Sequence, residues 1–169
     1  MHAYEFSGLA QLRATPVILR MMTEGLTPEE ASWKPSAKRW SVLEVLGHLA
    51  HVEVYGFRGR VERILGEENP LLPSHDPNSF TYDVPDLAEG LNSFERERSP
   101  SLRLLENLPA SALARGGVHS ALGPLTVLNL LNEWPLHDLG HIRQIAELIR
   151  AVKYYPHIGP WQNFYSLQP

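Results

Sequence analysis

The sequence has no cysteine, no long apolar run and no cluster of basic residues. Without a thiol, the chain can form no disulfide, thiolate metal site or cysteine nucleophile, so any thiol chemistry must use an external thiol. No stretch reaches the roughly 18 apolar residues of a membrane span, and the first residues lack the pattern of a secretion signal. We therefore expect a cytoplasmic protein with no membrane partner.

The charge and the length narrow the possibilities further. The formal net charge is -4, and the Lys and Arg residues are dispersed, which disfavours nucleic acid as a partner. A chain of 169 residues that is 43% hydrophobic can bury one substantial core but is too short for two ordinary domains. We expect a single domain over residues 1–169.

Apolar residues recur at steps of three and four over four long stretches, which predicts an all-α fold. The predicted helices are 4–24, 41–66, 86–108 and 126–152. Ser41 and Glu44 form a capping box at the start of the second helix, and Thr126 is placed to cap the fourth. The last residues, 154–169, are expected to be a non-helical cover in which aromatic residues such as Trp161 act as anchors.

Two connections lack a helical pattern. Residues 67–85 contain four prolines and, when extended, reach roughly 60 Å. The preceding helix is only roughly 39 Å long, so this connection can return the chain to that helix's start and make helices two and three parallel. His75, Asp76 and Tyr82 in this connection can face a pocket, but solvated positions are the favoured interpretation. Residues 109–125 form the second connection.

The most informative run is E-W-P-L-H-D-L-G-H-I-R-Q, from Glu133 to Gln144. It places His137 and His141 one helical turn apart, within the apolar arc of the fourth helix. Two buried imidazoles need partners for their ring nitrogens. A shared divalent cation meets that need. An ordinary pair of core histidines, hydrogen-bonded to backbone or water, is the alternative.

A third imidazole is available on the second helix. His48 lies at the edge of that helix's apolar arc, where a ligand at the mouth of a groove, or a partly exposed histidine, is expected. His51, one turn later, points toward the polar side and has only a weak claim on a metal. Three neutral ligands would leave a cation with open positions and its full charge, able to lower the pKa of a bound water or thiol.

Three polar neighbours can assist such a site. Glu133 and Gln144 flank the histidine pair, and either is a candidate catalytic residue, a fourth ligand or a hydrogen-bond partner of bound solvent. Asp138 lies in the apolar arc, so we expect it to bond to a ligand imidazole or to the indole of Trp40. The run Glu95-Arg96-Glu97-Arg98 is interpreted as a solvated face.

These residues resemble the DinB-like superfamily of four-helix-bundle metal proteins, which includes the bacillithiol and mycothiol S-transferases. The resemblance rests on W-S-V-L-E-V-L-G-H-L, ending in His48 and Leu49, and on H-D-L-G-H-I-R-Q-I from His137. It implies that His48, His137 and His141 are the metal ligands. The implied fold is an up-down-down-up bundle with a long connection between helices two and three, assembled as a homodimer. Glu133 departs from the pattern, because histidine is common at that position. The resemblance therefore does not decide what fills the fourth coordination position.

The combined expectation is a divalent-metal-binding protein that carries nickel, zinc, iron or cobalt. The favoured function is a metal-dependent transferase that acts on a small-molecule substrate and activates a low-molecular-weight thiol as cofactor. A metal-dependent hydrolase that activates water is the first alternative. The second is a non-catalytic bundle whose metal is structural and whose role is partner binding.

Overall fold

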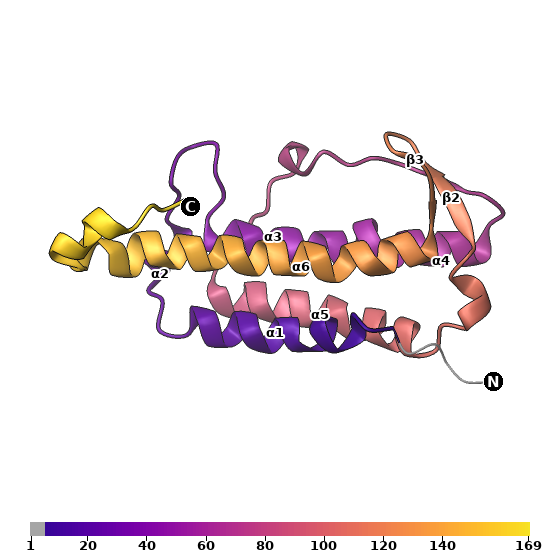
Figure 1. The fold of residues 1–169 in the computed structure, drawn as a ribbon, viewed down its shortest axis with the longest axis horizontal. Coiled ribbons are helices and arrows are strands. Elements are labelled where there is room, and N and C mark those ends of the chain that lie inside the picture. The colour runs from indigo at the N-terminus through magenta and orange to yellow at the C-terminus, as the bar shows by residue number, and fades with distance from the viewer. Residues whose placement is uncertain (1–5) are drawn as a thin grey trace.

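Four helical rods lie side by side in the computed structural model, which describes residues 6–169 (Figure 1). The second rod is built from two α-helices joined by a π-helical turn, Glu53–Arg58. The first predicted helix begins at Leu9 among the described residues, and its expected start at Tyr4 lies outside them. The helices of the bundle are α1 (Leu9–Thr23), α3 (Val42–Val52), α4 (Gly59–Gly66), α5 (Leu87–Glu106) and α6 (Val127–Ile149).

Side-chain caps mark where α3, α5 and α6 begin. The predicted capping box is present at α3, where the Glu44 N–H donates to Ser41 Oγ at 3.2 Å and the Ser41 N–H donates to Glu44 Oε2 at 2.8 Å. Thr126 caps α6 as predicted, and Asp86 caps α5. A short helix, α2 (Pro28–Ser32), precedes α3. Each cap satisfies backbone N–H groups that the first turn leaves unpaired.

The predicted topology is confirmed. In Figure 1, α1 and α6 run in one direction, whereas α3 with α4 and α5 run in the other, so the order is up-down-down-up. α3 packs on α5, and α1 packs on both α5 and α6. The connection over residues 67–85 passes back along the length of the bundle, which makes the second and third rods parallel.

A small sheet at one end of the bundle was not predicted, because both connections were expected to be irregular. The strands are β1 (Leu71–Leu72), β2 (Gly116–His119) and β3 (Gly123–Thr126), with β1 parallel to β2 and β2 antiparallel to β3. A Cβ at Gly117 would lie 2.7 Å from the Pro70 carbonyl oxygen, so glycine permits the close approach of β2 and β1. The sheet ties the long connection to the bundle.

The chain after α6 differs from the expectation of a non-helical cover. It continues through a π-helical turn, Arg150–Tyr154, and two 3₁₀ segments, Tyr155–His157 and Gly159–Phe164. Trp161 is 64% exposed and therefore does not anchor this segment. No helix in the described part of the chain is long and apolar enough to cross a membrane.

The core has two apolar clusters separated by a buried ionic network. The large side chains of one cluster include Phe57 and Trp134, and those of the other include Phe94 and Leu46. Between them along the helices lie Glu53, Arg98 and Asp138, each with a side chain only 1% exposed. Arg98 was expected on a solvated face, so that prediction was wrong.

Candidate metal centre

The structure brings together the three histidines that the sequence singled out. His48 comes from α3, and His137 and His141 come from one face of α6, the helix that passes α3 in the opposite direction. His137 Nε2 lies 3.2 Å from His48 Nε2 and 3.2 Å from His141 Nε2. All three ligand atoms lie within 4.8 Å of one another. The helical spacing of i and i+4 explains why the α6 pair shares a face.

His48 is more deeply placed than expected. It is 4% exposed rather than at the open edge of the helix, because the long connection folds over it. A Cβ at Gly47 would lie 2.9 Å from Tyr82 Cβ and 2.8 Å from Val84 Cγ2, so the glycine makes room for this cover. The Trp40 ring packs on His48 with a centroid separation of 4.7 Å.

Hydrogen bonds at the outer nitrogens select the tautomers of two histidines. The Tyr82 hydroxyl donates its single proton to the Pro77 carbonyl at 3.2 Å, so its oxygen accepts from His48 Nδ1 at 3.0 Å. His141 Nδ1 donates to Gln144 Oε1 at 2.8 Å. Both Nε2 atoms therefore carry lone pairs. Tyr82, expected in solvent, instead orients His48, and Gln144 orients His141.

The arrangement of nitrogens fits a bound cation. His137 Nε2 faces two lone pairs, and a single N–H can satisfy only one of them. Metal-to-imidazole bonds of about 2.0–2.1 Å at tetrahedral angles would separate the nitrogens by about 3.3–3.4 Å. Two of the three separations are 3.2 Å, close to this value, and the third is within 4.8 Å. His137 Nδ1 is buried and has no hydrogen-bond partner among the described residues.

The three imidazoles are held in the neutral form that binds metals. Burial lowers the pKa of His48 and of His137 to about 3, and the charges of neighbouring histidines act in the same direction. Burial also lowers the pKa of His141. At neutral pH each ring therefore keeps one nitrogen lone pair that can bind a metal, instead of carrying N–H donors at both nitrogens.

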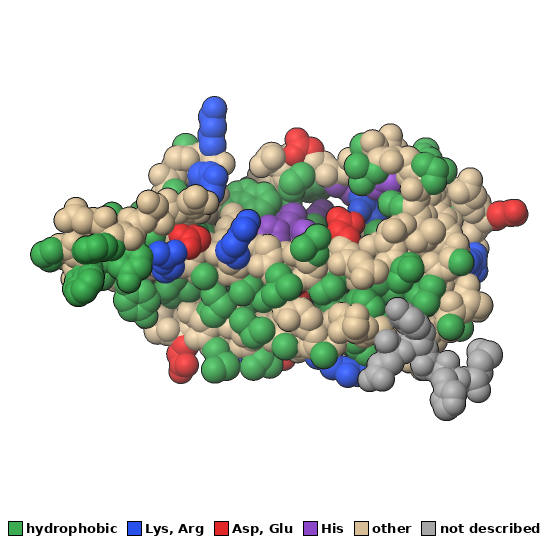
Figure 2. Space-filling model, in the orientation of Figure 1, with side chains coloured by type: hydrophobic (Ala, Val, Ile, Leu, Met, Phe, Trp, Pro, Cys, Tyr) green, Lys and Arg blue, Asp and Glu red, His purple; other side chains and the backbone are tan. Residues whose placement is uncertain are grey.

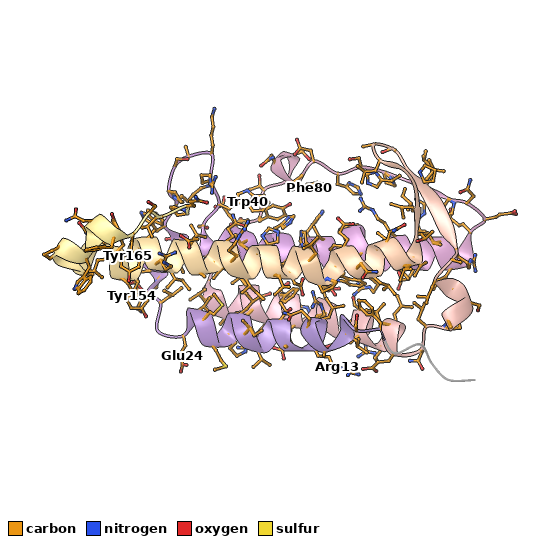
Figure 3. All side chains as sticks on the ribbon, in the orientation of Figure 1. Arg13, Glu24, Trp40, Phe80, Tyr154 and Tyr165 are labelled. Atoms are coloured by element: carbon orange, nitrogen blue, oxygen red, sulfur yellow. The ribbon has the colours of Figure 1, made fainter. Side chains whose placement is uncertain are left out.

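The histidines form part of the wall of a cavity of about 360 Å³. Figure 2 shows it as a hollow with histidine side chains on its sides and acidic and basic groups beside them. Trp40 and Phe80, labelled in Figure 3, reach it from the two connections that cross this face. Its other polar lining residues are His51, Tyr55, Arg60, His75, Tyr82 and Glu133.

The remaining sequence candidates divide between this cavity and other places. Glu133 and His75 line the cavity, and so does His51, for which a more polar position was expected. The carboxylate of Glu133 lies outside the three-histidine cluster. Asp76 instead caps the turn that begins at Pro77, where its Oδ1 accepts from the Asn78 N–H at 2.9 Å.

Asp138 does not bond to a histidine or to Trp40, which corrects the prediction. Both of its carboxylate oxygens accept from the Arg98 guanidinium, at 2.7 and 3.0 Å. Glu53 accepts from the same guanidinium at 2.8 and 3.0 Å and from the Trp134 indole N–H at 3.1 Å. Arg98 also donates to the Leu12 carbonyl at 2.8 Å, so the network touches every rod of the bundle.

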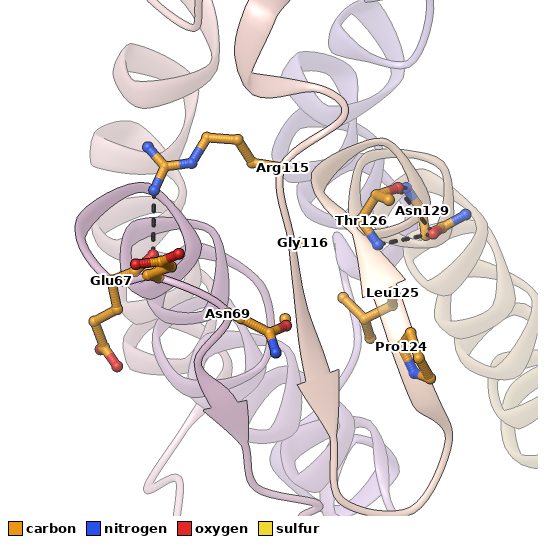
Figure 4. A pocket seen from close by; sticks show the side chains of 10 residues that line it. Glu67, Asn69, Arg115, Gly116, Pro124, Leu125, Thr126 and Asn129 are labelled. Atoms are coloured by element: carbon orange, nitrogen blue, oxygen red, sulfur yellow. Dashed lines mark hydrogen bonds between the residues drawn. The ribbon is translucent and has the colours of Figure 1, made fainter.

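A second cleft, of about 450 Å³, lies between the end of α4 and the β2–β3 hairpin (Figure 4). Its polar groups mostly bind one another: Arg115 donates to the Glu67 carbonyl at 3.2 Å, and Asn129 Oδ1 accepts from the Thr126 N–H at 2.9 Å. None of the three clustered histidines lines it. The cavity beside the histidines is therefore the better candidate for a functional site.

The fold and the site define an up-down-down-up helical bundle with three convergent histidines at the wall of a cavity. Comparison with known families agrees with this class. The DinB superfamily model matches residues 11–145, and the chain belongs to this superfamily. The resemblance drawn from the two histidine segments is thereby confirmed.

Two proteins of Bacillus subtilis illustrate the relationship. The chain is similar to YuaE of strain 168, with 26% identity over an alignment of 146 residues that covers 77% of this chain and 90% of YuaE. Its fold is similar to that of YfiT, with a TM-score of 0.76 and 24% identity over 85% of this chain and 84% of YfiT. YfiT is described as a probable metal-dependent hydrolase with an unusual four-helix bundle topology.

Proposed function

We propose that the protein binds one divalent cation through the Nε2 atoms of His48, His137 and His141 and acts on a small molecule as a metal-dependent transferase. The observation that carries this proposal is the convergence of three neutral imidazoles at the wall of an open cavity. Nickel, zinc, iron and cobalt all suit imidazole ligands, so availability can decide which is bound. A low-molecular-weight thiol is the proposed co-substrate.

When bound, a divalent cation with three neutral ligands keeps its +2 charge and lowers the pKa of a thiol or water at an open position. The chain's own residues supply orientation and exclusion of water. Tyr82 and Gln144 hold two imidazoles through their Nδ1 atoms. Phe57 packs edge-on against His137 at a centroid separation of 5.3 Å and closes its inner side.

Glu133 is the carboxylate that we assign to accept a proton, as a general base. It is the single carboxylate among the described residues that line the cavity, and it lies one helical turn before His137. No described residue forms an ion pair or a hydrogen bond with its carboxylate, so it is free to accept a proton from a reacting thiol or water. As an exposed group outside the histidine cluster, it suits this role better than that of a fourth ligand.

A metal-dependent hydrolase is the second candidate. The description of YfiT, whose fold is similar, favours it. Glu133 beside the histidines can accept the proton of a water as readily as that of a thiol. A non-catalytic bundle with a structural metal is the third candidate, and it is disfavoured by the cavity, because structural sites are usually closed by four protein ligands.

The transferase proposal predicts that thiols bind directly at the metal. In cobalt-substituted protein, adding a thiol should produce a sulfur-to-cobalt charge-transfer band in the near ultraviolet, measured by absorption spectroscopy. The chain has no cysteine that could produce such a band itself. If several biological thiols at saturating concentration change nothing, while Glu133→Ala opens the site to them, then Glu133 is a fourth ligand and the transferase proposal fails.

We also propose that the protein is a homodimer that associates through α1 and α6. These two helices pack together and present exposed apolar side chains, and Figure 2 shows such side chains along this face. Examples are Val17 and Met21 on α1 and Leu136 and Leu139 on α6. Burial of such a patch commonly drives two-fold association.

Sedimentation equilibrium tests this assembly. The wild type should sediment as a dimer at micromolar concentration, and Leu136→Asp should shift it toward the 19.1 kDa monomer. The matched control is Leu122→Asp, which adds the same charge at an exposed leucine of the β2–β3 turn. A wild-type mass of 19.1 kDa at all concentrations would rule the dimer out.

A further inference from the structure

Arg60 differs from its neighbours on the second rod in having no carboxylate within ion-pair distance among the described residues. Arg63, one turn away, holds Glu67 through two bonds of 2.8 and 2.9 Å, and Arg58 holds Glu97 at 2.9 Å. The Arg60 guanidinium makes one hydrogen bond to a described residue, from Nη2 to the Pro73 carbonyl at 3.1 Å. Its Nε is buried and has no acceptor in the described part of the chain.

The unpaired charge of Arg60 is partly enclosed, which is electrostatically unfavourable. Burial lowers the pKa of Arg60, and the charge of Glu133 offsets this only in part. Arg98 shows the contrast, because there the hydrogen bonds and charges of Asp138 and Glu53 outweigh burial and raise the pKa. A guanidinium keeps its proton at any physiological pH, so an anion would stabilise Arg60 in place of the missing carboxylate.

Other donors gather near Arg60. His75 lines the same cavity. His119 Nδ1 accepts from the N–H groups of Ala121 and Leu122 at 3.2 and 3.3 Å, so its proton is on Nε2. The pKa of His119 is lowered first by burial and then by the charge of Arg60, which places the two side chains within electrostatic range. Glu133 also acts on both side chains, so Arg60, His119 and Glu133 lie within electrostatic range of one another, although His119 itself does not line the cavity.

We propose that Arg60 binds a carboxylate of the substrate, so that the cavity takes small organic acids and orients them between Arg60 and the three histidines. Both groups line one cavity of about 360 Å³, a volume typical of small-molecule sites. Arginine binds carboxylates through charge-assisted hydrogen bonds with defined geometry. Glu133 lines the same cavity, and its charge also acts on Arg60, so it competes with a bound carboxylate for the guanidinium.

The contact with Arg60 does not depend on a metal, whereas placing the reacting group at the histidines rests on the proposed function. The first test therefore uses metal-free protein, with succinate as the probe and neutral succinamide as its uncharged counterpart. The buried Arg60 Nε–H should give a resolved resonance in a proton-nitrogen NMR spectrum, assigned by its loss in Arg60→Gln. Succinate should shift it with saturation at millimolar concentrations, and succinamide should not.

Arg60→Gln should weaken succinate binding, followed through cavity backbone resonances, by roughly tenfold or more. Arg103→Gln removes the same charge from an exposed position on α5 and should leave binding unchanged. If Arg60→Gln does not fold, Glu133→Gln provides an independent variant, which should tighten binding because it removes a competing charge. Equal binding by wild type and Arg60→Gln, or weaker binding by Glu133→Gln, would overturn the proposal. A response to phosphate but not to succinate would also overturn the assignment to carboxylates.

A second test separates this proposal from the proposed function. In cobalt-substituted protein, 3-mercaptopropionate should bind roughly tenfold more tightly than 2-mercaptoethanol, and Arg60→Gln should remove that difference. If neither thiol alters the cobalt spectrum but succinate titrates Arg60, the transferase proposal fails and the carboxylate site stands. If both thiols bind equally well and succinate has no effect, the carboxylate site fails and the metal chemistry stands.

Discussion

Purified protein should carry about one divalent ion per chain, and His137→Ala or His141→Ala should abolish binding. His137 Nε2 lies 3.2 Å from each of the other two Nε2 atoms, so its loss removes the nitrogen nearest to both partners. The loss of His141 leaves α6 with a single donor. His48→Ala should weaken binding strongly but not abolish it, because the pair on α6 remains. Elemental analysis after equilibration with zinc and gel filtration measures the metal content.

Two kinds of control make this result specific. His51→Ala removes an imidazole from the same cavity but outside the cluster, so it should keep the metal. Gln144→Leu and Tyr82→Phe remove groups that orient ligands and should lower the affinity by about 10–100-fold without abolishing binding. Unchanged metal content in the triple histidine variant would contradict the assignment, because the described residues contain no other such cluster.

The helices and the histidine cluster were predictable because their signals are local. The capping box of Ser41 and Glu44 lies within four residues, and the one-turn spacing of His137 and His141 fixes a shared face. The long connection was also readable, because its length allows α5 to run parallel to α3. Such features depend on backbone geometry that holds wherever the segment lies in the fold.

The contacts between distant segments were not predictable in the same way. Tyr82 reaches His48 only because the connection folds over Gly47, and the sheet pairs β1 with a strand far along the chain. Arg98 was mistaken for a solvated residue because charged neighbours surround it in the sequence. Its spacing from Phe94 and Leu105 does place it on the buried seam of α5, so periodicity contained a signal that its charge obscured.

Arg98→Met should destabilise the protein by about 3–5 kcal/mol, since it leaves two buried carboxylates without their shared cation. Glu53 and Asp138 each accept two hydrogen bonds from this guanidinium, and both side chains are only 1% exposed. The network lies between the two apolar clusters, where water cannot replace the lost partner. Urea unfolding of metal-free protein at neutral pH measures the change in the free energy of unfolding.

The matched control is Arg20→Met, which removes an arginine from the exposed ion pair with Glu95 and should cost about 1 kcal/mol or less. Replacing all three network members with apolar residues, as Glu53→Met, Arg98→Met and Asp138→Leu, should recover much of the loss, because no charge is then left buried alone. The triple variant should also lose metal affinity, because Asp138 adjoins His137 and its bond to Arg98 fixes that turn of α6. If Arg98→Met and Arg20→Met change the free energy of unfolding equally, the buried network does not stabilise the bundle more than an exposed ion pair does.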